Sequence, residues 1–131
     1  MTVLNQQTMS RLRKVLDARY KGLVEDVREE LERSGDQHYI DLAGRVTDAG
    51  DEAVAGLLAD LDAAMIDRQV QELRDIEAAR ERIRTGGYGV CIDCGNEIGA
   101  ARLTAYPTAK RCIQCQTKRE KEFAHPGTPK L

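Results

Sequence analysis

Two C-x-x-C pairs constrain this chain more than any other feature of its sequence. All four cysteines of the 131 residues lie between positions 91 and 115, with 17 residues separating the two pairs. Zinc accepts four thiolates in a tetrahedron, and this spacing is typical of a structural zinc site. The sequence therefore predicts one zinc ion, and its ligands are Cys91, Cys94, Cys112 and Cys115.

Other uses of paired cysteines fit this sequence less well. The rival interpretations are a redox pair or a disulfide framework, but a redox C-x-x-C is expected near a βαβ pattern, which the sequence does not show. His38 and His125 are the only histidines, and four thiolates already complete a site without them. A closed site leaves no position for water, so we expect a structural ion and no enzyme activity.

The composition favours an elongated helical protein. Only 4% of residues are aromatic and 32% are charged, which suits helices that bury a narrow seam better than a compact globule. Residues 88–131 carry seven Lys/Arg against four Asp/Glu, and residues 1–87 carry thirteen against eighteen. Neither part has the basic excess of a general nucleic-acid binder. The sequence shows no apolar leader and no run long enough to span a membrane, so we expect a cytoplasmic protein.

Apolar residues at helical spacing predict two long helices. The first covers residues 8–33 and ends at Ser34-Gly35; the second starts near Thr47 or Asp48 and reaches about Thr85. Neither helix can bury its apolar stripe alone, so the two are expected to pair as an antiparallel hairpin. The charged residues of the second helix are expected to be solvated: Glu72, Arg74, Asp75, Glu77, Arg80, Glu81, Arg82 and Arg84.

The segment between these helices is acidic. Residues 34–53 carry five acids and few apolar residues, and we expect a connection with about one helical turn. Asp48 and Asp51 stand three residues apart at the expected start of the second helix, where carboxylates cap free amides. They could also present a compact negative tip to a cation or to a basic channel in a partner. The chemistry of these residues alone favours capping.

The sequence thus predicts a mainly α fold, a long antiparallel coiled-coil hairpin followed by a small four-cysteine zinc finger. We expect the hairpin over residues 1–86, with the acidic tip near 47–53. Gly86-Gly87 should end the second helix, and residues 87–124 should hold the finger and a short C-terminal helix over 116–124. Residues 125–131 are expected to be a flexible tail.

The motifs around the cysteines resemble those of a known family. The segments YGVCIDCG, IG, RL and YPTAKRCIQC, with the hairpin before them, resemble the DksA/TraR family of bacterial RNA polymerase regulators over residues 9–124. The family's tip motif, Asp-x-x-Asp-x-Ala, stands here as Asp48, Asp51 and Ala53. The resemblance implies a monomer that binds RNA polymerase rather than DNA. It also implies that the tip enters the secondary channel and alters open promoter complexes, with Arg68 facing the polymerase.

Members of the DksA type act with the stringent-response nucleotide guanosine tetraphosphate (ppGpp), and this chain departs from them at three positions. Tyr106 stands where they carry Arg, Gln116 where they carry Lys, and Asp75 where they carry another Lys. A ligand with several phosphates needs cations at such positions, so we expect weak or no dependence on ppGpp through this surface.

A second function stays open on the sequence. A zinc finger could bind nucleic acid or another protein without acting on polymerase. Nucleic-acid binding would require a basic stripe and aromatic side chains. The finger offers few aromatics and a modest set of cations, which are Arg102, Lys110, Arg111, Lys118 and Arg119.

Overall fold

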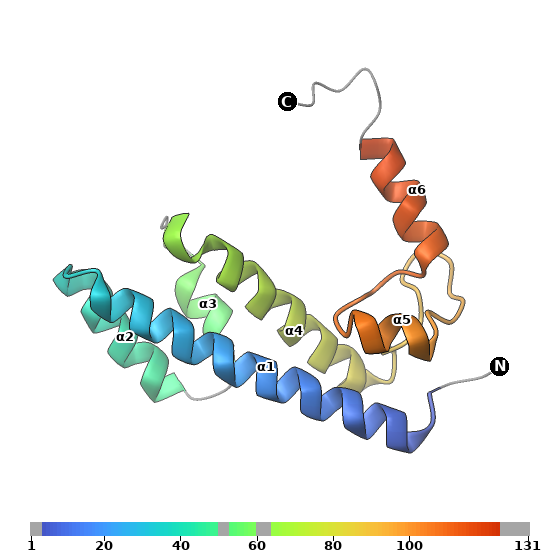
Figure 1. The fold of residues 1–131 in the computed structure, drawn as a ribbon, viewed down its shortest axis with the longest axis horizontal. Helices are drawn as coiled ribbons and strands as arrows, with labels where there is room; N and C mark the ends of the chain where they lie inside the picture. Colours follow the sequence, from blue (N-terminus) through green and yellow to red (C-terminus); the bar gives the residue numbers. More distant parts are fainter. Residues whose placement is uncertain (1–3, 50–52, 60–63, 124–131) are drawn as a thin grey trace.

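The structure is a computed structural model that describes residues 4–49, 53–59 and 64–123. Its helices are α1 (Gln6–Arg33), α2 (Gln37–Ala49), α3 (Val54–Leu58), the 3-10 helix η1 (Ala64–Ile66), α4 (Asp67–Thr85), α5 (Ala100–Ala105) and α6 (Ile113–Phe123). α1 runs along an elongated helical body, and the region of α5 and α6 lies at the end where α1 begins (Figure 1). The mainly α fold with a short C-terminal helix is confirmed, although α6 begins at Ile113, within the second C-x-x-C pair, and not at the predicted residue 116.

The first helix forms where its apolar stripe predicts it. α1 begins after Asn5, whose side-chain oxygen accepts a hydrogen bond from the Thr8 N–H at 2.7 Å. It ends at Ser34, whose hydroxyl donates to the Leu31 carbonyl at 2.7 Å, and Gly35 follows at a φ of 77°. The helix buries one face, composed of Leu12, Leu16, Tyr20, Val27 and Leu31.

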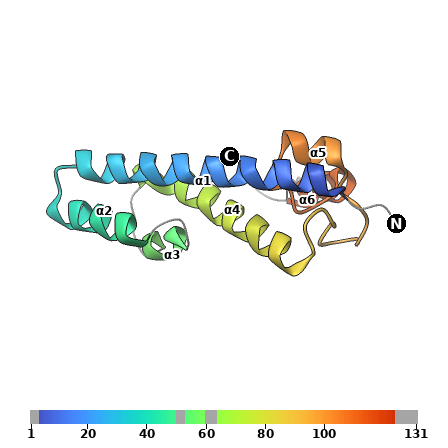
Figure 2. The same cartoon turned by 90° about the horizontal axis from the view of Figure 1, so that it is seen from below.

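The prediction of a mostly irregular connection over residues 34–53 is wrong. α2 fills most of it and folds back along α1, on the half of α1 farthest from the finger (Figures 1 and 2). Asp36 starts this helix, because its carboxylate accepts the His38 N–H at 2.8 Å. Three small or medium apolar residues, Leu42, Ala43 and Val46, are buried and suffice to hold α2.

The prediction of one continuous helix from Thr47 or Asp48 to Thr85 is also wrong. Among the described residues this stretch holds three elements besides the end of α2, and Ala53 precedes α3 with a left-handed φ of 46°. α3 packs against α4 instead of leading straight into it. α4 then returns across α1 towards the finger, so the antiparallel relation of a hairpin is kept between α1 and α4 (Figure 2).

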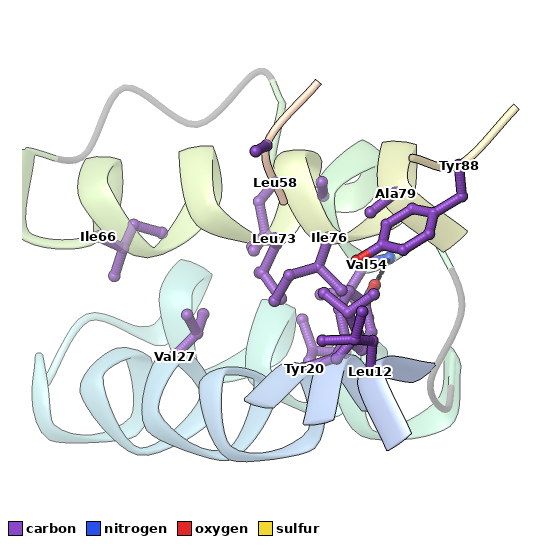
Figure 3. Packing of buried hydrophobic residues seen from close by; sticks show 14 of the residues in the cluster. Leu12, Tyr20, Val27, Val54, Leu58, Ile66, Leu73, Ile76, Ala79 and Tyr88 are labelled. Carbon is purple, nitrogen blue, oxygen red and sulfur yellow. Dashed lines mark hydrogen bonds between the residues drawn. The ribbon is translucent and has the colours of Figure 1, made fainter. Parts of the chain in front are cut away.

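A polar cluster ties these pieces together inside the core. The fully buried Tyr20 donates its hydroxyl hydrogen to the Glu77 carboxylate and accepts the Val54 N–H at 3.1 Å. Glu77 also accepts the Ala55 N–H at 3.1 Å, so α1, α3 and α4 meet at one point. Figure 3 shows Tyr20 of α1 beside Val54 of α3. Arg80 lies 4.1 Å from the centre of the Tyr20 ring. The expectation that Glu77 is simply solvated is therefore wrong.

The end of α4 leads directly into the finger. Gly86 takes a φ of 91°, and the N–H groups of Gly87 and Tyr88 both bond to the Arg82 carbonyl, at 2.8 and 3.1 Å. The predicted stop at Gly86-Gly87 is confirmed. Tyr88 then turns inward and donates its hydroxyl to the Pro107 carbonyl at 2.8 Å, which ties the start of the finger to the segment after α5. Across the described ranges, no helix combines the length and apolar character that crossing a membrane requires.

Candidate metal centre

The first C-x-x-C pair forms a tight turn that aims two sulfurs at one point. The Sγ of Cys91 accepts the N–H groups of Asp93 and Cys94 at 3.4 and 3.5 Å. Gly95 closes the turn by donating its N–H to the Cys91 carbonyl at 3.0 Å, with a φ of 79° that glycine adopts without strain. These N–H donors stabilise a thiolate at Cys91.

The second pair repeats this arrangement at the start of a helix. The Sγ of Cys112 accepts the Cys115 N–H at 3.4 Å, and α6 begins at the residue after Cys112. The Gln116 N–H bonds to the Cys112 carbonyl at 2.9 Å, which continues the turn into the helix. We call each pair with its two inner residues a knuckle, so that the knuckles are 91–94 and 112–115.

The four sulfurs lie at the spacing that zinc requires. All four Sγ atoms lie within 4.8 Å of one another, and those of Cys94 and Cys112 are 3.8 Å apart. A tetrahedron with Zn–S bonds of about 2.3 Å has edges of about 3.8 Å, so an ion fits among them. Cys91 and Cys112 are buried and Cys94 is exposed. The predicted ligand set is thus brought together in one structural zinc site.

The thiols of this cluster differ in acidity. Burial alone would raise the pKa of the Cys91 thiol, but backbone hydrogen bonds from Cys112, Cys94 and Asp93 lower this pKa to about 6. The pKa of the Cys115 thiol is raised, first by its hydrogen bond with Cys112 and then by burial. Zinc binds thiolates, so binding to a cluster of cysteines releases protons and the apparent affinity increases with pH.

Asp48 lies elsewhere than the sequence suggested. Asp48 is the penultimate residue of α2, near the C-terminal end of a helix and not at a helix start, where the sequence placed it. Because a helix C-terminus carries partial negative charge, the helix dipole does not favour the carboxylate of Asp48 there. Asp51 lies outside the described residues. Ala53 is exposed and directly precedes Val54, which bonds to Tyr20 in the middle of α1, so Ala53 does not lie at the far end of the body.

The other positions singled out from the sequence lie on exposed or half-buried surfaces. Arg68 is exposed in the first turn of α4. Asp75 is half-buried along the same helix and accepts a hydrogen bond from Gln71 at 3.1 Å. The Tyr106 ring lies 5.4 Å from the Arg102 guanidinium, and Gln116 donates to Glu120 at 2.9 Å.

Sequence reasoning missed one pair of residues beside the sulfurs. Arg111 immediately precedes the second knuckle, and Asp93 lies within the first; the Arg111 Nε and Asp93 Oδ2 atoms are 2.8 Å apart. The sequence does show an acidic residue within the first pair and a basic residue just before the second. The two stand 18 positions apart, however, and no local sequence pattern predicts that such distant residues touch.

Comparisons with known proteins agree with this site. Residues 86–121 match the family model described as the prokaryotic dksA/traR C4-type zinc finger. The RNA polymerase-binding transcription factors DksA of Haemophilus influenzae and of Escherichia coli K12 are each 32% identical to this chain over 124 residues. Those alignments cover 92% of this chain and 82% and 79% of the two relatives.

The fold agrees as well. The structure of transcription factor DksA2 from Pseudomonas aeruginosa superposes with a TM-score of 0.60 at 28% identity, and covers 92% of this chain and 89% of the other. Similar architecture and the same cysteine site therefore coincide with sequence identity over nearly the whole chain. The chain belongs to the DksA/TraR family.

Proposed function

We propose that this protein is a bacterial transcription regulator that binds RNA polymerase directly. The observation that carries the proposal is the alignment of 92% of the chain with factors named for RNA polymerase binding. The slender body suits entry into a narrow channel, since a 28-residue helix such as α1 is about 42 Å long at 1.5 Å per residue. The protein would enter the secondary channel and alter open promoter complexes, acting in the cytoplasm as a monomer.

The finger would contribute structure to this function and no catalysis. Four thiolates leave no open coordination position at which zinc could activate water or polarise a substrate. α5 is the single helix between the knuckles and has only six residues, and a structural zinc supplies folding free energy to such a small segment. We therefore assign the protein no enzyme activity.

The acidic segment is the proposed site of action on polymerase. We assign this role to Asp48, Asp51 and Ala53, and a polymerase contact to Arg68. Asp48 is exposed and makes no side-chain hydrogen bond or ion pair within the described parts of the chain. A carboxylate that supports neither its helix nor a neighbour is available for a partner.

Dependence on ppGpp through the surface of this protein is proposed to be weak. Gln116 carries no charge and already bonds to Glu120, while Tyr106 packs beside Arg102. Asp75 adds a negative charge to α4. A ligand with several phosphates would lack the cations that charge-assisted hydrogen bonds require at these positions.

A pull-down of the zinc-loaded chain with bacterial core RNA polymerase tests the proposal. We expect retention of polymerase, competition by purified DksA, and a changed half-life of open complexes in vitro. Glu29→Gln, an exposed change on α1, serves as the control and should bind normally. Binding to random DNA at moderate salt without binding to polymerase would instead support a nucleic-acid-binding finger.

A further inference from the structure

The two knuckles are joined by an ion pair that uses one residue from each side. Asp93 lies between Cys91 and Cys94, and Arg111 is the residue before Cys112. The Arg111 Nε donates to the Asp93 Oδ2 at 2.8 Å. We propose that Asp93 and Arg111 act as a clamp that holds the two knuckles at the spacing zinc requires and so slows release of the ion.

The burial of Arg111 shows that the pair is more than a surface contact. Arg111 is the only charged residue buried within the described ranges, with a relative exposure of 9%. A guanidinium withdrawn from water is costly unless it is paired and hydrogen-bonded. Asp93 supplies the pairing, and Arg102 fixes the same residue from the other side by donating its Nε to the Arg111 carbonyl at 3.0 Å.

The pair is coupled to the sulfurs through the backbone. The Asp93 N–H donates to the Cys91 Sγ, so whatever fixes the Asp93 side chain also fixes a hydrogen-bond donor to a zinc ligand. Beside it, the Ile92 N–H bonds to the Lys110 carbonyl at 2.9 Å, which joins the same two segments of the chain. Groups in this position orient the ligands of a metal, and their loss typically lowers metal affinity about 10- to 100-fold.

Electrostatics alone makes the opposite prediction for Asp93. Zinc with four thiolates carries a net charge of about −2, so a carboxylate beside it should weaken binding and its neutralisation should strengthen binding. A clamp requires that carboxylate to hold Arg111. The substitution Asp93→Asn thus separates the two explanations by the sign of its effect.

The experiment measures zinc release from the full-length protein in excess chromogenic chelator. We expect Asp93→Asn and Arg111→Gln each to speed release about tenfold. The double variant should be no faster than the faster single variant, because each substitution removes the same contact. Lys110→Gln is the matched control: it removes an exposed positive charge next to Arg111 and should change the rate by less than about twofold.

A second readout keeps the proposal testable if a variant is isolated with less than one zinc. Cobalt(II) added to the reduced protein reports tetrahedral thiolate coordination by its absorption spectrum, and Arg111→Lys preserves the charge with a different geometry. We expect a weakened or altered cobalt spectrum in Asp93→Asn and Arg111→Lys, with normal helical content. Slower or unchanged zinc release in Asp93→Asn, or additive effects in the double variant, would overturn the proposal.

Discussion

The hydroxyl of Tyr20 on α1 donates a hydrogen bond to the carboxylate of Glu77 on α4, 57 residues later in the chain. The same oxygen accepts the Val54 N–H, and the same carboxylate accepts the Ala55 N–H. One buried phenol and one carboxylate thus hold the beginning of α3 against both long helices. This is the point at which the start of α3, directly after Ala53, is attached to α1 and α4.

Replacing Tyr20 by Phe should weaken this attachment. The substitution keeps the ring but leaves the Val54 N–H without its acceptor, and an unsatisfied buried group costs about 1–3 kcal/mol. We expect the free energy of unfolding in urea to fall by that amount, with faster amide exchange at residues 54 and 55. Tyr39→Phe is the control, because the Tyr39 hydroxyl has no hydrogen-bond partner among the described residues. Equal stability of Tyr20→Phe and the parent would contradict the structural role.

The two buried tyrosines should make the fold sensitive to alkali. Burial raises the pKa of Tyr88 to about 12, and burial together with the hydrogen bond to Glu77 raises the pKa of Tyr20. Both groups keep their protons in the folded state where the unfolded chain loses them, so their contribution is complete below about pH 10 and is lost above it. Above about pH 10, each of the two tyrosines should lower the free energy of unfolding by at most about 1.4 kcal/mol per pH unit.

Denaturant titrations at several pH values between about 8 and 11 check this prediction. Tyr88→Phe should be less stable than the parent at the lower end of this range, because the Pro107 carbonyl loses its donor. Its stability should nevertheless fall less steeply above about pH 10, since one ionising group is gone. A slope that is identical in the two proteins would show that Tyr88 does not contribute to the alkaline transition.

Loss of zinc should unfold the finger and leave the helical body folded. Cys112→Ser removes a buried ligand that also accepts the Cys115 N–H, so the variant should bind no stoichiometric zinc and residues 88–120 should unfold. α1 to α4 bury their own apolar side chains and should keep most of the helical circular-dichroism signal. Gln114→Ser, an exposed change inside the same knuckle, should keep one zinc per chain. A zinc-free yet fully folded Cys112→Ser finger would contradict this account.

The sequence was sufficient for those parts of the protein whose determinants are local. Two C-x-x-C pairs define a four-thiolate site without further information, and the apolar stripe of α1 predicts its end at Ser34-Gly35 correctly. Gly86 marks the end of α4 because the left-handed turn there favours glycine. Each of these features depends on residue types that stand close together in the chain.

The predictions that were wrong concern features that depend on contacts between distant segments. The helix α2 was not predicted because residues 34–53 contain five acids and few apolar residues. Its small apolar face stabilises the helix only by packing against α1, and consists of Leu42, Ala43 and Val46. The break before α4 is stabilised where Tyr20 meets Val54 and Glu77, which no periodicity reveals. Glu77 likewise stands in a run of charged residues typical of a solvated face. Its partner Tyr20 lies on another helix, so the sequence does not indicate that Glu77 forms a contact in the core.

Neutralising the acidic segment should separate binding from regulation. Asp48→Asn with Asp51→Asn should bind polymerase nearly as well as the parent, because most contact area would come from the helical body and the finger. The effect on open complexes should be lost with the charges. Asp48 lies near a helix C-terminus, so Asn should not destabilise α2, and thermal unfolding should be unchanged. Asp41→Asn on the same helix is the control. Normal regulation of open complexes by the double variant would show that the charges of Asp48 and Asp51 are not needed for regulation.

The response to ppGpp is expected to be small when only the surface of this protein is available to the nucleotide. Tyr106 and Gln116 supply no positive charge, and Asp75 adds a negative one. A charge-assisted hydrogen bond contributes about 1.5–3 kcal/mol, so two losses correspond to about a hundredfold or more in affinity. The measurement is a promoter assay with and without ppGpp, with a polymerase whose own ppGpp site is disabled.

The combined variant Tyr106→Arg, Gln116→Lys and Asp75→Lys should gain a response, because it restores three cations at once. Strong synergy between ppGpp and the unmodified protein would contradict the prediction, and would indicate that cations such as Lys110 or Lys118 bind the phosphates instead.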